Sequence, residues 1–304
     1  METILAAEEA GRGIEGASLP LGGVQAALSV DFARDPLTSS TILAGSHQEP
    51  PLKVVRAFAL EDGSALAHLH NVSGGLLGGD RLALTVRVGA GASVQLTTTG
   101  ATRVYRPREE ARTVTQLNEI SVGENALLEY VPDAIIPFAG ARYSQRTTIH
   151  LASGAGLFWW EILAPGREAR GEIFEYDRVE MRTDLVALGR PIAAERVCLE
   201  PRRRNISDLA RLGPSRYWVT FYVCRVGLNT QTWLAAEQRL RDVAAGLTRS
   251  GEILFGVSAL VAHGLVIRCL ARRGRGVLGS LHPLWNEAKL FLYDREAVPP
   301  RKVN

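Results

Sequence analysis

The sequence predicts a mainly β protein that folds as one large domain, with two α-helices late in the chain. Short runs rich in β-branched and aromatic residues recur along most of the 304 residues, and Gly, Pro, Asn or Asp stands in most of the gaps between them. Helical periodicity appears only in the last quarter of the sequence. The sequence holds no linker rich enough in Pro, Gly or Ser to separate two domains, so a single domain is expected.

The predicted strands are short segments with an apolar residue at every second position or with an unbroken apolar run. Residues 82–88 have Leu or Val at every second position, which is typical of a strand with one buried face. Residues 157–163 are apolar on both faces, which indicates a strand buried on both sides. The predicted strands cover residues 54–60, 65–72, 82–88, 93–98, 126–131, 144–151, 157–163, 173–181, 193–199 and 217–226, with two more between 252 and 270.

The first helix is predicted near residues 231–248, where apolar residues recur at steps of three or four. Thr230 or Thr232 is its expected N-cap, because a hydroxyl can accept a hydrogen bond from a free backbone N–H of the first turn. The positions that define the apolar stripe are Trp233, Ala236, Leu240, Val243, Ala244 and Leu247.

The second helix is predicted near residues 281–293, with Ser280 as its cap and Leu284, Ala288 and Phe291 on its apolar side. The remaining segments complete the expected organisation of the chain. They are a loose N-terminal arm, a single β domain that includes both helices, and a C-terminal tail, at residues 1–17, 18–296 and 297–304 respectively.

The composition is that of an ordinary globular protein, with 46% hydrophobic and 22% charged residues. A formal net charge of +3 is too small to predict a nucleic-acid partner, and the basic clusters at 202–204 and 272–273 lack interleaved aromatic residues. The three cysteines are widely spaced, which favours reduced thiols in a cytoplasmic protein over disulfides or a zinc site. No apolar run approaches the roughly 18 residues of a membrane span, so no membrane contact is expected.

A glycine-rich run at residues 70–82 lies between two predicted strands. Gly74 and Gly79 have the spacing of a phosphate-binding loop, but Asp80 and Arg81 follow where that loop requires Lys and Ser or Thr. A carboxylate would repel a phosphate, and a strand follows instead of a helix whose N-terminus could hold an anion. We therefore interpret the run as a turn that places one acid, Asp80.

Three glutamates occupy positions that the periodicity assigns to the interior. Glu161 shares a strand face with apolar residues, and the opposite face of the same strand is apolar too. Glu129 and Glu195 similarly alternate with aliphatic neighbours. An isolated buried carboxylate costs several kcal/mol. Each of these acids is therefore expected to be paired with a cation, hydrogen-bonded, protonated or in contact with internal water.

Alternative explanations of these acids remain open. The arginines could neutralise each acid in a buried ion pair. The acids could instead line a hydrated passage suited to a divalent cation, or serve as the paired carboxylates of a hydrolase. His68 and His70 would point to the same face of a strand and are weak candidates for a metal pair, because no third ligand has a matching spacing. The candidate ion-pair partners are Arg103, Arg106, Arg142, Arg167, Arg178 and Arg196.

Four sequence blocks in a specific order resemble the UreD family of urease accessory proteins, called UreH in some organisms. The blocks are residues 73–80, 98–106, 128–141 and 160–174. Glu161 stands where the family often has Asp, and Tyr130 where it often has Trp. The positions that carry the resemblance include Gly74, Gly75, Gly78, Gly79, Tyr105, Arg106, Gly166, Arg167 and Gly171.

The resemblance implies a fold of β-helix-like stacked sheets and a chaperone for urease maturation that is not itself an enzyme. Such proteins dock on the urease apoprotein and on UreF, and UreF recruits the GTPase UreG, so GTP acts only through that partner. Nickel is expected only in transit, through an internal acid-lined channel that leads toward the urease active site. Carried onto this chain, the channel residues are Asp80, Thr102, Glu161 and Glu195, with Glu129 and Glu172 as neighbours.

Overall fold

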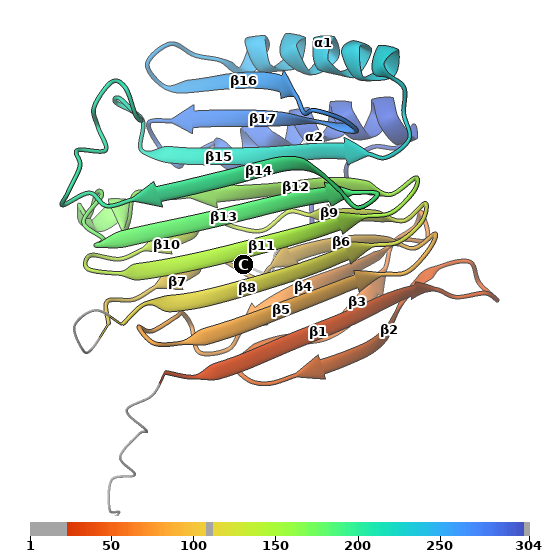
Figure 1. Cartoon of the computed structure of the whole chain (residues 1–304), viewed down its shortest axis with the longest axis horizontal. Helices are drawn as coiled ribbons and strands as arrows, with labels where there is room; N and C mark the ends of the chain where they lie inside the picture. The colour runs from red at the N-terminus through yellow and green to blue at the C-terminus, as the bar shows by residue number, and fades with distance from the viewer. Residues whose placement is uncertain (1–22, 108–111, 301–304) are drawn as a thin grey trace, which may run out of the picture.

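The computed structural model describes residues 23–107 and 112–300, which form two β-sheets and two α-helices (Figure 1). The arm expected at residues 1–17 and the last four residues of the expected tail lie outside the described residues. The first sheet has seven strands, in the spatial order β14 (Arg190–Leu199), β13 (Arg178–Ala187), β11 (Arg142–Leu151), β8 (Val114–Val122), β5 (Arg81–Val88), β1 (Gln25–Arg34) and β2 (Thr41–Gln48).

The second sheet has ten strands and lies behind the first in Figure 1. Its main path runs in the order β16 (Ile253–Ala259), β17 (Gly264–Ala271), β15 (Tyr217–Arg225), β12 (Gly156–Leu163), β9 (Leu127–Tyr130), β6 (Ser93–Thr98), β4 (Ala65–Asn71) and β3 (Leu52–Ala59). Two short strands, β7 (Thr102–Val104) and β10 (Ile135–Pro137), pair with each other, and β10 also pairs with β12. A single 3₁₀ turn, η1 (Glu168–Arg170), follows β12.

Between β4 and β13 the chain passes back and forth between the two sheets. The strands that become neighbours in this way are parallel, from β5 to β13 in one sheet and from β4 to β12 in the other. The predicted mainly β fold with two late helices is confirmed. The finer expectation of a β-helix-like stack stays a prediction, because antiparallel strands flank the parallel ones at both ends of each sheet.

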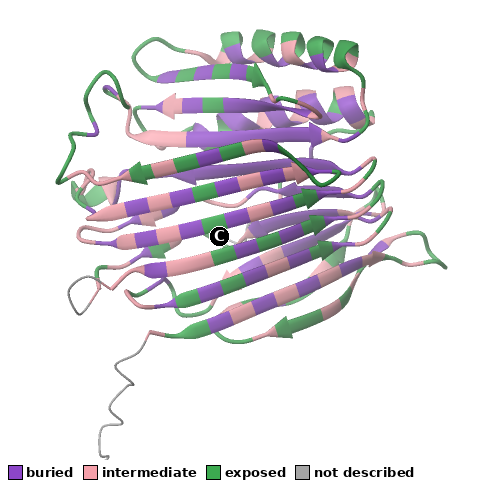
Figure 2. Ribbon diagram, in the orientation of Figure 1, coloured by how far each residue is buried: buried purple, intermediate pink, exposed green. Residues whose placement is uncertain are grey.

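Two apolar layers explain the burial pattern in Figure 2, in which buried and exposed residues alternate along the strands of the seven-stranded sheet. One layer lies between the sheets and contains inward residues such as Leu84, Leu96 and Trp159. The other lies between the ten-stranded sheet and the helices, where Trp160 packs. Every residue of β12 is buried, since the strand contributes side chains to both layers. This confirms the prediction for residues 157–163.

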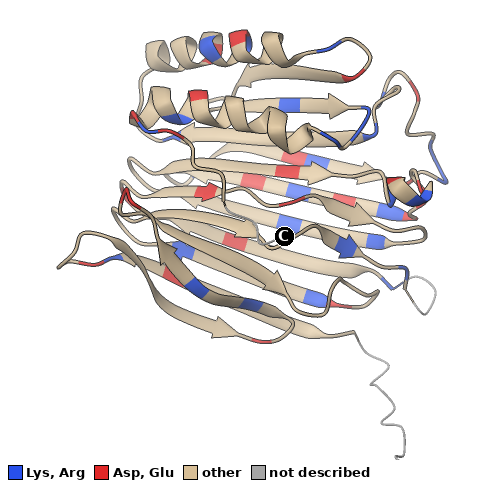
Figure 3. Ribbon diagram, turned by 180° about the vertical axis from the view of Figure 1, so that it is seen from behind, with Lys and Arg blue, Asp and Glu red and all other residues tan. Residues whose placement is uncertain are grey.

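The two helices, α1 (Thr230–Leu247) and α2 (Val277–Tyr293), cover the outer face of the ten-stranded sheet, as the view from behind in Figure 3 shows. Both helices begin differently from the sequence-based prediction. Asn229, not a threonine, caps α1, and its side chain accepts a hydrogen bond from the backbone N–H of Thr232. Helix α2 starts after Gly276, so Ser280 is a buried helical residue and not a cap. Among the described residues, no helix is long and apolar enough to cross a membrane.

Several strand assignments need correction. Strands β2, β7 and β10 are absent from the predicted strands, and two further differences have a clear physical reason. The strand predicted at residues 173–181 begins only at Arg178, because Phe174 has a left-handed φ of 56° and no regular strand can include it. Strand β8 was not predicted, although it lies in the middle of the seven-stranded sheet. Two of its inward positions are the polar residues Gln116 and Asn118, which hide the apolar alternation that marks the neighbouring strands.

A buried ion pair fastens α2 to the sheet. The Lys289 ammonium donates to the Glu129 carboxylate at 2.7 Å, and the indole N–H of Trp285 donates to the other carboxylate oxygen, also at 2.7 Å. Both charged side chains are only 5% exposed. Burial raises the pKa of Glu129, and the nearby Lys289 opposes that rise. Glu129 is thus a link between helix and sheet.

Removing one member of this pair should be costly. We expect Lys289→Met to lower the free energy of unfolding by about 3 to 5 kcal/mol at pH 8, because it leaves a buried carboxylate without its cation. The double variant Lys289→Met/Glu129→Gln should recover most of the loss, since glutamine still accepts from Trp285. Urea denaturation measures both values.

The exposed pair Arg249–Glu252 is the matched control, and Glu252→Gln should change stability by less than about 1 kcal/mol. Similar losses in Glu252→Gln and Lys289→Met would contradict a stabilising role for the buried pair.

Candidate functional site

A row of polar side chains crosses the interior between the two sheets. In the seven-stranded sheet it runs over directly paired residues of β8, β11, β13 and β14, which are Asn118, Thr147, Thr183 and Glu195. In the ten-stranded sheet it runs over directly paired residues of β12, β15 and β17, which are Glu161, Thr220 and Arg268. Paired residues point to the same face of a sheet, so strand register alone aligns them. We call these seven residues the polar seam.

Hydrogen bonds join the two halves of the polar seam across the gap between the sheets. The side-chain amide of Gln145 on β11 donates to one oxygen of Glu161. The Thr183 hydroxyl donates to the other oxygen at 3.5 Å. The same Gln145 lies 3.3 Å from Thr147, which accepts from Asn118 at 3.0 Å. These bonds connect Asn118, Thr147, Thr183 and Glu161 through Gln145, whereas the Thr220 hydroxyl has no hydrogen-bond partner among the described residues.

Glu161 has no cation against its carboxylate among the residues the structure describes, and its side chain is buried. Burial raises the pKa of Glu161 to about 8, with the hydrogen bond from Gln145 opposing the rise, the negative charge of Glu195 adding to it and Thr183 opposing it. The carboxyl group is therefore mostly protonated at neutral pH. Of the explanations left open by the sequence, hydrogen bonding and protonation apply to this acid.

Glu195 is held differently. One carboxylate oxygen accepts from the guanidinium of Arg268, and the other accepts from the Tyr222 hydroxyl at 2.8 Å. This ion pair joins β14 of one sheet to β17 of the other. Glu195 therefore fits the ion-pair explanation, with a partner that was not among the arginines proposed from the sequence.

Two neighbouring cavities lead from the glycine-rich loop toward Glu161. The outer cavity, of about 270 Å³, is lined by Gly74, Gly75 and Arg103 near its mouth. The inner one, of about 40 Å³, reaches Glu161. The residues that line both are Thr98, Thr102, Gln116 and Tyr130. Thr102 thus lines both cavities, while its assignment as a channel residue stays a prediction.

Other predicted channel residues lie outside this arrangement. The Asp80 carboxylate accepts from the backbone N–H groups of Val24 and Leu77, at 2.9 and 2.8 Å, which makes it a structural brace for the glycine-rich loop. Glu129 points to the opposite face of the ten-stranded sheet from Glu161, into the layer beneath the helices. Both acids are buried, as the periodicity predicted for Glu129, but the structure does not bring them to the polar seam.

Glu172 forms a local ion pair with Arg167, whose guanidinium donates to both of its carboxylate oxygens. The bond from Arg167 lowers the pKa of Glu172, and a backbone bond from Ala139 lowers it further. The pair spans five residues of one loop, in which Gly171 ends the 3₁₀ turn with a φ of 80° and Gly166 packs against the Glu172 carbonyl. This block is therefore a folded loop and not part of the seam.

Close packing explains the glycine motif. A Cβ on Gly75 would overlap the ring of Tyr105, and one on Gly78 would overlap Pro107. The Tyr105 ring in turn packs edge-on against Phe138, with centroids 4.9 Å apart, while Arg106 lies against Gly140. The glycines thus let the loop lie flat against residues 103–107, and Gly74, Gly75 and Arg103 contribute to the lining of the outer cavity.

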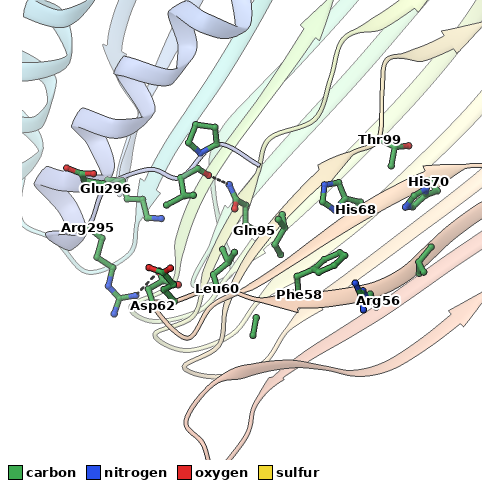
Figure 4. Close-up of a pocket in the computed structure, with 17 residues that line it drawn as sticks. Arg56, Phe58, Leu60, Asp62, His68, His70, Gln95, Thr99, Arg295 and Glu296 are labelled. Carbon is green, nitrogen blue, oxygen red and sulfur yellow. Dashed lines mark hydrogen bonds and ion pairs between the residues drawn. The ribbon is translucent and has the colours of Figure 1, made fainter. Parts of the chain in front are cut away.

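His68 and His70 line a much larger cavity of about 1580 Å³, on the outer face of the ten-stranded sheet beside the end of α2 (Figure 4), and His70 also lines the outer cavity of about 270 Å³. Partial burial lowers the pKa of His70, and His68 lowers it further. Over residues 23–107 and 112–300 no group of three or more His, Cys, Asp or Glu is arranged to hold a metal ion. The histidine pair therefore gains no third such ligand, and it lies on the other side of the sheet from the polar seam.

Comparison with known proteins gives the family. The family model of the UreD urease accessory protein matches residues 24–304. The chain belongs to the UreD family. Urease accessory protein UreD of Herpetosiphon aurantiacus is 46% identical over 276 residues, which cover 91% of this chain and 95% of that relative. The UreD proteins of Lysinibacillus sphaericus and Staphylococcus aureus (strain bovine RF122 / ET3-1) are each 26% identical, over 86% and 82% of this chain and 96% and 87% of their own lengths.

Membership confirms the resemblance that the four sequence blocks indicated. A UreD protein is an accessory factor with a role in urease maturation and not a catalytic enzyme, so the hydrolase alternative is set aside. Sequence reasoning missed the UreD seam residues Thr220 and Arg268. Each is a lone polar residue inside an otherwise apolar strand, which is the signal that could have revealed them.

The raised pKa of Glu161 predicts a pH-dependent contribution to stability. Its folded-state pKa of about 8 lies above the ordinary value of 4.5, so its contribution is present below pH 4.5 and is lost as the pH rises through 8. The stability of the wild type relative to Glu161→Gln should therefore fall between these values, by at most about 1.4 kcal/mol per pH unit.

Urea denaturation at several pH values between 5 and 9 measures this difference. Glu119→Gln, at an exposed position of β8, is the matched control for the loss of one carboxyl group. A pH-independent difference between the wild type and Glu161→Gln would contradict a raised pKa of Glu161 in the folded protein.

Proposed function

We propose that this UreD protein is a docking scaffold for urease maturation and that it passes nickel to the urease active site along the polar seam. The observation that carries the proposal is Glu161, a buried carboxyl group without a cationic partner among the described residues, which the inner cavity reaches. Its carboxyl group becomes a negative ligand once its proton leaves, and a cation that enters the inner cavity would favour that ionised form. Family membership supplies the urease context.

The seam offers oxygen donors that suit a hard or borderline divalent cation. Glu161 supplies a carboxylate once its proton leaves, Thr183 supplies a hydroxyl, and rotation of the Gln145 amide exchanges its donor for a carbonyl oxygen. Clustered cysteine and histidine ligands would hold nickel too tightly for transfer. A path on which only one or two carboxylates bind the metal ion at each point favours weak binding and release of nickel.

The proposed docking partners follow from membership in the UreD family. The urease apoprotein receives the metal, UreF binds this chain, and UreG supplies nickel and GTP hydrolysis, all in the cytoplasm. The membership of the chain in an accessory-protein family supports an interaction with the urease machinery.

A second candidate function is a scaffold that docks proteins but carries no metal. The ion pairs Glu129–Lys289 and Glu195–Arg268 favour it, because paired acids contribute to structure without any cargo. The two candidates differ in what they say of Glu161. A scaffold that carries no metal gives no reason for a buried acid without a cationic partner. Substitution of this residue therefore separates them.

Glu161→Gln should lower the nickel content of urease several-fold while the complex with UreF and apo-urease still forms. Glutamine keeps the size and a hydrogen-bond acceptor of the side chain but cannot become a negative ligand. Metal analysis of purified urease and a pull-down of the complex measure the two effects, with Glu119→Gln as the control. Full nickel loading in the Glu161→Gln variant would eliminate the path and leave the docking scaffold.

Nickel binding should also release a proton from Glu161. Because the pKa of this group is raised to about 8, binding of Ni²⁺ to the purified protein at pH 6.5 should displace its proton, and the release should fade above pH 9. Glu161→Gln should abolish that release. Titration with Ni²⁺ in a weakly buffered solution that contains a pH indicator measures it, and equal release from wild type and variant would place the cation elsewhere.

A further inference from the structure

The polar seam ends at the Glu195–Arg268 ion pair, at the edge of the seven-stranded sheet. Glu195 lies on β14, the last strand of that sheet, and Arg268 lies on β17, the second strand from the end of the longer sheet. The Glu195 side chain is 10% exposed, whereas that of Arg268 is 51% exposed. The guanidinium therefore stands between the buried acid and solvent.

The position of the guanidinium opposes the exit of a cation. Arginine keeps its positive charge at any physiological pH, so it repels a second cation that approaches the same carboxylate. Both oxygens of Glu195 already accept hydrogen bonds, one from Arg268 and one from Tyr222. A metal ion that arrives from Glu161 thus meets an acid already occupied by another cation.

Beside Arg268 there is room for its side chain to move. The directly paired residue on β16 is Gly256, and a Cβ built there would meet no atom within 4 Å. Gly256, Leu254 and Ser258 share one exposed face, because the shorter sheet ends at β14 and does not cover β16, as Figure 1 shows. Rotation of the arginine away from Glu195 and over Gly256 would not require the backbone to shift.

We propose that Arg268 is a gate at the far end of the polar seam, closed when its guanidinium pairs with Glu195 and open when the side chain swings over Gly256. The proposal rests on the nickel path proposed above and adds its exit and its closed state. In the closed state the fixed positive charge keeps a cation within the seam near Glu161. Opening frees the carboxylate of Glu195 as the last ligand before solvent or a docked protein.

Gly256→Leu tests the gate without touching any acid or ion pair. Leucine at the paired position fills the space that the open arginine needs, so nickel loading of urease should slow several-fold. Leucine is compatible with this exposed face, where Leu254 already lies, and a Cβ at this position meets no atom within 4 Å. The matched control is Ser258→Leu, two residues along the same face, which should load nickel at the wild-type rate.

Arg268→Gln is the complementary variant, since it removes the positive charge and keeps a polar side chain at this exposed position. It should raise the affinity of the purified protein for Ni²⁺, because Glu195 becomes available. The double variant Arg268→Gln/Gly256→Leu should load nickel at the rate of Arg268→Gln alone, because leucine cannot obstruct an arginine that is absent. If Arg268→Gln fails to fold, the comparison of the nickel-loading rates of Gly256→Leu and Ser258→Leu still tests the gate.

The outcomes separate the gate from the path. Slow loading in Gly256→Leu, normal loading in Ser258→Leu and relief by Arg268→Gln support the gate. Wild-type loading in Gly256→Leu, or a double variant as slow as Gly256→Leu, overturns it. If Glu161→Gln loads poorly while Gly256→Leu loads normally, only the gate is wrong. Normal loading in Glu161→Gln removes the path and the gate together.

Discussion

Burial of the Glu161 carboxyl group between two sheets sets the conditions that the rest of the interior has to meet. A carboxyl group in this position needs hydrogen-bond partners from the opposite sheet, which Gln145 and Thr183 provide. Gln145 and Thr183 are polar and buried too, so they also need hydrogen-bond partners. Polar residues therefore occupy directly paired positions on the neighbouring strands. The interior is therefore polar in one band and apolar elsewhere in the core between the sheets.

Strand register aligns residues that are far apart in the sequence and so forms this polar band. The polar seam draws on strands from β8 to β17, which are separated by up to 150 positions in the chain (268 − 118). Strand pairing, parallel from β8 to β13 and antiparallel between β13 and β14 and from β12 to β17, keeps these residues at one level. A slip of one residue in a strand would turn its seam side chain to the opposite face. The same register leaves Gly256 beside Arg268.

Sequence reasoning predicted the fold class and the burial of the three glutamates, because alternation along a single strand reports directly on which face is covered. It could not predict which acids meet, since that depends on contacts between strands. Glu129 and Glu161 look alike in sequence, yet they face opposite sides of one sheet. The bond that Asp80 accepts from the backbone of Val24 joins residues 56 positions apart, so the sequence pattern around Asp80 gives no sign of it. Strand β8 escaped prediction because Gln116 and Asn118 occupy inward positions.

The burial of β12 on both faces ties two parts of the molecule together. Adjacent side chains of this strand project in opposite directions, so Trp160 lies against Trp285 of α2, with ring centroids 5.7 Å apart, while Glu161 lies in the interior. Anything that pushes the helical layer against Trp160 also displaces the backbone that carries Glu161. A protein that binds the outer side of α2 could therefore change the position of Glu161 without contacting it.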